Sequence, residues 1–158
     1  MSEFRIQYDN RDLTLVLERL ILRNTKLKPL FREISDALVI STQARFESQT
    51  TPDNIAWDVL KPATLARKEK RGRPPNKLKQ DLNLVYSLRA DFSETFGGVS
   101  VGGAGVPYAA IHQFGGTPGM APGPAAIPAR TYLGISASDT AEIVAIALAY
   151  ERNAILGI

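Results

Sequence analysis

Tyr-Ala-Ala-Ile-His-Gln-Phe-Gly-Gly at residues 108–116 and Ile-Pro-Ala-Arg-Thr-Tyr-Leu-Gly at residues 127–134 are the stretches that decide the fold of this chain. They lie in or beside residues 95–129, which contain no Asp, Glu, Lys or Arg. A soluble protein seldom leaves so long a segment uncharged unless much of it is covered. We therefore expect these stretches to be covered by the protein's own core or by a neighbouring subunit.

Helices are expected on both sides of these stretches. An apolar stripe with helical spacing at residues 13–21 follows Asp12, which is a suitable cap. A last helix is expected to begin at a cap formed by Asp139. Two further helices are predicted from Pro29 to about Phe46, with an inner face of Leu30, Ile34, Leu38 and Ser41, and from Pro62 to about Lys70.

Strands are expected mainly in the middle of the chain. Alternating apolar and polar residues predict strands at 4–8, 84–92, 99–101 and 130–135, with a turn at Gly97–Gly98. The length of residues 108–114 is compatible with a helix or a strand. This order of elements predicts an α+β fold, in which helices pack on a small antiparallel sheet beside a long Gly/Pro-rich loop and a C-terminal helix.

Length and composition favour one domain, residues 1–158, with mobile loops expected at about 68–80 and 115–127. The chain has no Cys and a single His, so we expect no disulfide, no thiolate chemistry, no metal site and no cofactor. We find neither a signal peptide nor an apolar run long enough to span a bilayer. The protein is therefore expected to function in a cytoplasm or in a particle assembled there.

One short motif resembles an enzyme signature but lacks its context. Residues 98–102 match the G-x-S-x-G pattern of a nucleophile elbow, centred on Ser100. That motif requires a strand, a sharp turn and a helix, whereas glycine-rich turns are expected after Ser100. The lone His112 has no evident acidic partner, and it is more typical of a packed or capping residue than of a general base. We therefore predict that the protein is not an enzyme.

Positive charge is concentrated in residues 61–80. Eight Lys and Arg residues against Glu69 alone give this segment a charge of +7, which leaves −4 for the rest of a chain with a net charge of +3. The segment is interpreted as a solvated loop, a contact with the backbone of DNA, or a contact with an acidic protein. It has no aromatic residue to stack on bases. The candidate contact residues are Arg67, Lys68, Lys70, Arg71, Arg73 and Lys77.

The order of several motifs resembles the virion morphogenesis, or tail completion, family of Mu-like bacteriophages and prophages. Residues 108–116 and 127–134 carry most of the resemblance. They are preceded by Arg45-Phe46, Pro52-Asp53, Trp57 and the segment Leu60-Lys61-Pro62-Ala63-Thr64-Leu65. Asn54 and Asp81 depart from the family pattern, which usually has Gly near both positions.

The resemblance implies a minor structural protein of the virion, located at the neck or tail top and assembled in the host bacterial cytoplasm. Such proteins act in tail completion or head–tail joining as oligomeric rings, commonly homo-hexamers, with a lumen that conducts DNA. The implied partners are other copies of the chain, connector or neck proteins, tail tube or tail terminator proteins, and the backbone of phage DNA. No membrane partner is implied. The alternative function is that of a sequence-independent nucleic-acid-binding accessory protein.

The uncharged segment supplies the candidate interface. The Gly/Pro-rich loop has little apolar bulk of its own, and its lack of charge would lower the cost of desolvation against a neighbour. It is open whether this loop orders on a partner or stays exposed, and whether Arg130 pairs with a carboxylate or is an ordinary surface residue. The candidate interface residues are Tyr108, His112, Phe114, Gly115, Gly116, Met120, Arg130 and Tyr132.

Overall fold

The computed structural model describes residues 18, 26–73, 75, 78, 83–101, 108–116 and 127–156. The strand expected at residues 4–8 lies outside these ranges, as does the helix expected at 13–21 except for Glu18, which is helical. Lys77 and Met120 also lie outside them, together with most of the loop between residues 115 and 127.

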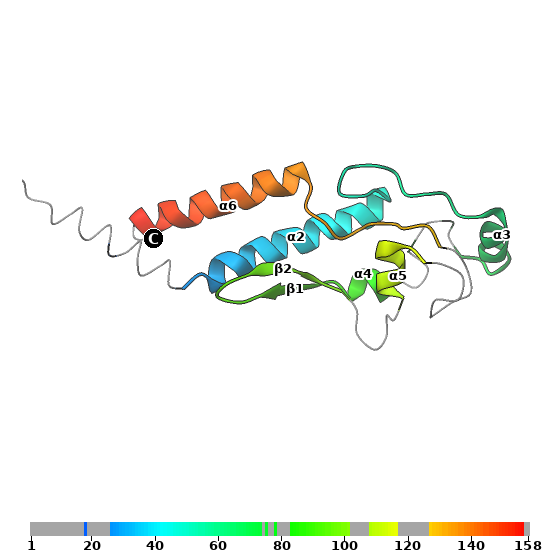
Figure 1. Cartoon of the computed structure of the whole chain (residues 1–158), viewed down its shortest axis with the longest axis horizontal. Coiled ribbons are helices and arrows are strands. Elements are labelled where there is room, and N and C mark those ends of the chain that lie inside the picture. The colour runs from blue at the N-terminus through cyan, green and yellow to red at the C-terminus, as the bar shows by residue number, and fades with distance from the viewer. Residues whose placement is uncertain are drawn as a thin grey trace, which may run out of the picture.

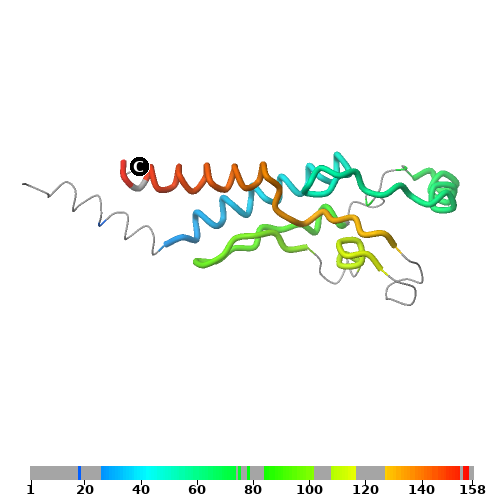
Figure 2. Tube along the Cα trace, turned by 45° about the horizontal axis from the view of Figure 1, so that its top comes forward, coloured from blue at the N-terminus to red at the C-terminus, as the bar shows by residue number. Residues whose placement is uncertain are grey.

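A long central helix, α2 (Lys28–Ser48), organises the fold. It forms one layer between helix α6 (Ala137–Leu156) and a hairpin of strands β1 (Arg89–Phe92) and β2 (Gly97–Ser100), all of which contact it (Figure 1). The same order of layers is visible in the turned view of Figure 2. The fold is therefore α+β with an antiparallel sheet, as the sequence predicts.

The start of α2 is stabilised by contacts with neighbouring elements. Its first peptide N–H, that of Lys28, donates a 3.0 Å hydrogen bond to the carboxylate of Glu94, where the helix dipole favours negative charge. Tyr150 of α6 donates to the Lys26 carbonyl at 2.9 Å, so the two helices run antiparallel. On the predicted inner face Ile34 and Leu38 are buried, whereas Ser41 is only half-buried.

The hairpin lies close against α2 because of one hydroxyl and one glycine. Ser35 Oγ accepts a hydrogen bond from Gly98 N at 2.8 Å and lies 3.2 Å from the Asp91 carbonyl, so it bridges α2 to both strands. A Cβ at Gly97 would lie 2.7 Å from the carbonyl oxygen of Phe31. Gly97 and Gly98 therefore belong to β2, at the point where this strand approaches α2 closely. The turn predicted at these residues is formed instead by residues 93–96.

The strand predicted at residues 84–92 is wrong in its first half. Residues Asn83–Tyr86 form a helical turn, α4, and only Arg89–Phe92 are extended. Leu84, Ser87 and Leu88 are buried while Tyr86 is exposed, which is the spacing of a helical turn. A run this short satisfies both periodicities, and packing against the core decides between them.

The remaining helices are short and lie toward the end of the molecule opposite the C-terminus of α6 (Figure 1). Helix α3 (Pro62–Lys70) has the predicted bounds, and residues 108–114 resolve as helix α5 (Ala109–Phe114). A core cluster at this end links α2 to these elements through Phe46, Trp57, Leu84, Leu88, Ala109 and Tyr132. A second cluster, Ile34, Leu38 and Ile146, lies between α2 and α6.

The strand predicted at residues 130–135 is not formed. The backbone of this segment has side chains as partners instead of another strand: Arg45 Nη1 donates to the carbonyls of Tyr132 and Gly134 at 3.0 and 2.8 Å. Trp57 Nε1 donates to the carbonyl of Thr131 at 3.1 Å. Alternation in sequence shows which side chains are buried but not what the peptide groups bind.

Asp139 stabilises the start of α6, but not as the predicted cap. It is the third residue of the helix, and Ser136 precedes the first. Asp139 N donates to Ser136 Oγ at 3.0 Å, and Ser136 N donates to Asp139 Oδ2 at 2.7 Å, which is a reciprocal capping box. The buried carboxylate of Asp139 also forms an ion pair with Arg45 Nη2.

Replacing Arg45 by Met should strongly destabilise the fold. The variant would leave the buried Asp139 carboxylate without its cation and the carbonyls of Tyr132 and Gly134 without the Arg45 donor, and we expect a loss of about 3–5 kcal/mol in the free energy of unfolding. Urea denaturation would measure it. The matched control is Arg32→Met on the same helix, because Arg32 is 69% exposed in a 3.8 Å ion pair with Asp36. This control should cost less than about 0.5 kcal/mol, and equal losses in the two variants would refute the role of Arg45.

Candidate functional site

Gln113 joins the two signature stretches into one unit. Its Oε1 accepts hydrogen bonds from the backbone N–H groups of Tyr132 and Leu133, both at 3.0 Å, and its Nε2 donates to the Leu133 carbonyl at 3.0 Å. Arg130 N donates to the His112 carbonyl at 2.8 Å. We call residues 108–116 and 127–134 the paired segments. Sequence analysis did not single out Gln113, although it lies within the first signature.

Two glycines and a bridge close the base of the intervening loop. Gly116 and Ile127 exchange two backbone hydrogen bonds of 2.9 Å. Gly115 has φ +79°, which favours glycine, and a Cβ at Gly116 would lie 2.5 Å from Ile111. The predicted residues Gly115 and Gly116 therefore hold one side of the loop base, and Ile127 forms the other side.

The predicted interface residues differ widely in exposure. Tyr132 is fully buried, donates its hydroxyl to the Ala109 carbonyl at 2.9 Å and packs on Phe46, and burial raises its pKa to about 12. Tyr108 is half-buried, with its ring edge-on to His112. Phe114, in contrast, is 80% exposed at the end of α5. Tyr132 thus supports the paired segments from inside, while Phe114 is available at the surface.

A pocket of about 300 Å³ lies between the paired segments and α3. Its walls include the apolar residues Val59, Leu78 and Ile127. Most of the polar residues that line the pocket are basic, and we therefore call it the basic pocket. These basic residues are Lys61, Arg67, Lys68, His112 and Arg130. The structure thereby brings two predicted groups together, His112 and Arg130 from the interface set and Arg67 and Lys68 from the basic segment.

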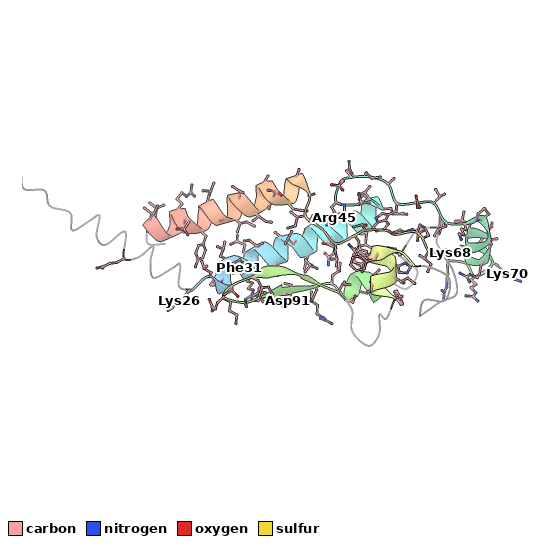
Figure 3. All side chains as sticks on the ribbon, viewed as in Figure 1. Lys26, Phe31, Arg45, Lys68, Lys70 and Asp91 are labelled. Carbon is pink, nitrogen blue, oxygen red and sulfur yellow. The ribbon has the colours of Figure 1, made fainter. Side chains whose placement is uncertain are left out.

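The other described cations of the basic segment lie on or beside α3. Figure 3 labels Lys68 and Lys70 on this helix, at the end of the molecule opposite the end of α6. Arg67, Lys70 and Arg71 are exposed, and Arg73 is half-buried. Lys68 differs from its neighbours because it is only 7% exposed. The basic segment therefore has an exposed part and a part that faces the pocket.

Arg130 is not an ordinary surface residue. It is 5% exposed, and its Nε and Nη2 lie 3.4 Å from the Asp58 carbonyl oxygen, a long distance for a hydrogen bond. Among the described residues no carboxylate forms an ion pair with it. Burial lowers the pKa of the guanidinium, and the charge of Asp58 acts in the opposite direction. The carboxylate pairing considered for Arg130 is therefore not made within the described fold.

His112 is half-buried beside this cation. Burial, and secondarily the charge of Arg130, lower its pKa to about 4, so the imidazole is neutral at pH 7. Its Nδ1 is buried and has no hydrogen-bond partner among the described residues. The interpretation of His112 as a packed residue agrees with its partial burial. The unsatisfied Nδ1 atom was not expected from the sequence.

The elbow-like motif lacks the geometry of a nucleophile. Ser100 is the exposed last residue of β2, paired with Arg89, and not a residue on a turn into a helix. Within the described ranges, no three His, Cys, Asp or Glu side chains gather where a metal ion could be held. Nor does any helix in those ranges have the length and apolar character needed to cross a membrane.

The paired segments thus combine a hydrogen-bonded loop base, an exposed aromatic side chain and a basic pocket. The model of the phage virion morphogenesis family matches residues 8–150. The chain is 34% identical over 143 residues to "Putative capsid assembly protein G" of Escherichia phage Mu, covering 89% of each chain. It is 32% identical over 134 residues to "Mu-like prophage FluMu G protein 2" of Haemophilus influenzae, covering 85% of each.

The chain belongs to the phage virion morphogenesis family. The resemblance inferred from the signature stretches is thereby confirmed. No solved structure matches the chain.

Acidification should weaken the fold through His112. The pKa of its imidazole is about 4 in the folded protein against an ordinary value of 6.5, so the unfolded chain binds the proton more readily between these values. Stability is therefore fully present above about pH 6.5 and is lost as the pH falls toward 4. We expect a loss of about 2 kcal/mol, allowing for partial solvent screening.

Urea denaturation of the wild type and of His112→Gln at about pH 7 and about pH 4.5 would measure this contribution. The glutamine variant cannot titrate, so its stability should change less between the two conditions. Identical changes in the two proteins would show that His112 does not contribute.

Proposed function

We propose that the protein is a virion component that acts in tail completion or head–tail joining, by binding and not by catalysis. The observation that carries this proposal is the closed loop base. The Gly116–Ile127 bridge and the Gln113 hydrogen bonds hold together the two described segments that flank the uncharged residues 117–126. An uncharged loop held in this way, beside the exposed Phe114, suits a protein interface.

A ring of identical subunits is the proposed assembly, with a homo-hexamer as the expected form. The layered part of the molecule exposes apolar side chains on α2 and α6, among them Ile40, Val144, Leu148 and Leu156. The paired segments and α3 lie at the opposite end of the molecule (Figure 1). Different surfaces at the two ends favour head-to-tail contacts, which generate rings when the rotation closes.

In this proposal the ring lies at the neck or tail top. One of its faces would contact connector or neck proteins and the other the tail tube or tail terminator proteins, while DNA passes through the lumen. The name of the phage Mu relative refers to capsid assembly, which supports a role at the head end of this joint. The protein would be assembled into the particle in the host cytoplasm.

Electron microscopy of lysates from a phage that lacks this gene would test the proposed function. We expect filled heads beside unattached or misterminated tails, and joined virions when the gene is supplied in trans. Supplying Phe114→Asp should fail to restore joining, because the charge is placed on an exposed apolar contact, whereas Phe114→Leu should restore it. Intact virions from the deletion phage would remove the joining role.

Sequence-independent binding of nucleic acid remains the second candidate, and the exposed cations of the basic segment favour it. Arg67, Lys70 and Arg71 are exposed on and beside α3, where they could contact phosphates without reading bases. Lys68 is the wrong residue for testing this idea, because its burial makes a charge reversal destabilising.

The triple variant Arg67→Glu, Lys70→Glu, Arg71→Glu tests the second candidate. If DNA is a ligand, reversal should abolish binding to duplex DNA at low salt, and the wild-type affinity should fall steeply as salt is added, as counterion release requires. Fluorescence anisotropy would measure both effects. The control reverses three exposed cations elsewhere, Arg32, Arg89 and Arg152, with the same change in net charge. Unchanged DNA binding in the first variant, or equal losses in both, would reject a specific role for the segment.

A further inference from the structure

The basic pocket contains a buried cation that the described fold does not neutralise. Arg130 is almost fully buried, yet within the described ranges the only hydrogen bonds of its guanidinium are two long contacts with the Asp58 carbonyl. A buried guanidinium is costly to maintain unless it is paired and hydrogen-bonded. The side chain of Asp58 is exposed and does not form an ion pair with Arg130.

His112 adds a second unsatisfied group to the same pocket. It lines the pocket with Arg130, and its buried Nδ1 has no partner among the described residues. Buried polar atoms in folded proteins are nearly always hydrogen-bonded, so this exception beside a buried cation makes the pocket a candidate ligand site. A group with oxygen acceptors in the pocket would satisfy the guanidinium of Arg130.

We propose that the basic pocket binds the carboxylate of an Asp or Glu side chain carried on an otherwise apolar segment of a protein partner. The charges are complementary, because the described residues that line the pocket include four cations and no acid. A carboxylate can accept two hydrogen bonds from one guanidinium, the geometry that Arg favours. The apolar walls formed by Val59, Leu78 and Ile127 suit the hydrophobic neighbours of such a side chain.

The dimensions of the pocket favour a protein side chain over the backbone of DNA. A volume of about 300 Å³ is small, and the Arg130 and Lys68 side chains within it are 5% and 7% exposed. A duplex is a wide rod whose phosphates reach exposed cations outside the pocket, such as those of Lys70 and Arg71, more readily than buried ones. The exposed and the pocket-facing parts of the basic segment are thus suited to different ligands.

This inference deepens the proposed function, on which it rests only for the claim that the partner is a virion protein. Binding of a carboxylate to the isolated protein does not require any assembly. The two claims can therefore fail separately, and the experiment has one part for each.

Isovalerate, a small branched carboxylate, is the probe for the first part. His112 is the only histidine, so its imidazole gives a single resonance at the pocket in nuclear magnetic resonance spectra of the labelled protein. Titration with isovalerate at about pH 7 should shift this resonance to saturation. Isovaleramide, which has the same shape without the charge, should give no saturable shift. Inorganic phosphate and a short DNA duplex should bind more weakly than isovalerate.

The variants separate loss of the site from loss of the fold. Arg130→Gln should raise the Kd for isovalerate at least tenfold, about 1.4 kcal/mol. Because that variant affects a buried residue, the main test is Val59→Asp, at a pocket residue that is 81% exposed. The introduced carboxylate should raise the Kd about fivefold relative to Val59→Asn. Ile55→Asp, at an exposed residue that lines a different groove, should leave the Kd unchanged.

Two results would overturn the carboxylate site. Absence of saturation, or an equal response to isovaleramide, would show that the pocket does not recognise the charge. A saturable shift of the His112 resonance at a lower concentration of phosphate or of the duplex than of isovalerate would assign the pocket to a phosphate ligand instead.

The second part supplies Val59→Asp and Val59→Asn to the phage that lacks the gene. We expect joining to be lost with the aspartate and kept with the asparagine. Normal joining by a Val59→Asp protein that no longer binds isovalerate would show that no partner docks in the pocket, while the proposed function would stand. If the deletion phage already gives joined virions, the proposed function fails, and the titration still decides whether the carboxylate site exists.

Discussion

The rest of the structure depends on the contacts made by the buried guanidinium of Arg45. It donates hydrogen bonds from α2 to the carbonyls of Tyr132 and Gly134, and it forms an ion pair with Asp139 at the start of α6. Burial alone would raise the pKa of the Asp139 carboxyl, but hydrogen bonds with Ser41 and Ser136 and the charge of Arg45 outweigh it and lower the pKa. One cation thus fixes the central helix, the second signature stretch and the last helix relative to one another.

The second signature stretch is an extended segment supported by side chains instead of a sheet. Arg45, Trp57 and Gln113 bind its peptide groups, and the buried Tyr132 anchors it to the cluster around Phe46. In the described part of the chain no strand pairs with this segment, and residues in and around it line two pockets. The basic pocket includes Arg130, and a groove of about 330 Å³ includes Ile135. A segment held in this way can present two binding surfaces while keeping the base of the adjoining loop in place.

Sequence reasoning succeeded where one periodicity was long and failed where runs were short. The helices α2 and α3 were predicted nearly at their observed bounds, because a long stripe or a proline at the start of a helix is a local signal. The helix α6 was also predicted, but it begins before Asp139, the expected cap. Leu84 to Phe92 and Arg130 to Ile135 were both predicted as strands. In the first, a few buried residues fit a helical turn equally well, and in the second the hydrogen-bond partners lie far away in sequence.

By itself the sequence determined the α+β class, the long helices, the two signature stretches and, through their resemblance, the family. These depend on local spacing and on residue types that can be read without coordinates. Only the tertiary structure decided that Arg130 and His112 meet Lys68 in one pocket, that Tyr132 is core while Phe114 is surface, and that Gln113 and Arg45 connect the parts. These facts arise from contacts between residues as far apart in the chain as Arg45 and Asp139, and burial there changes the energy of each charge in ways that no local pattern records.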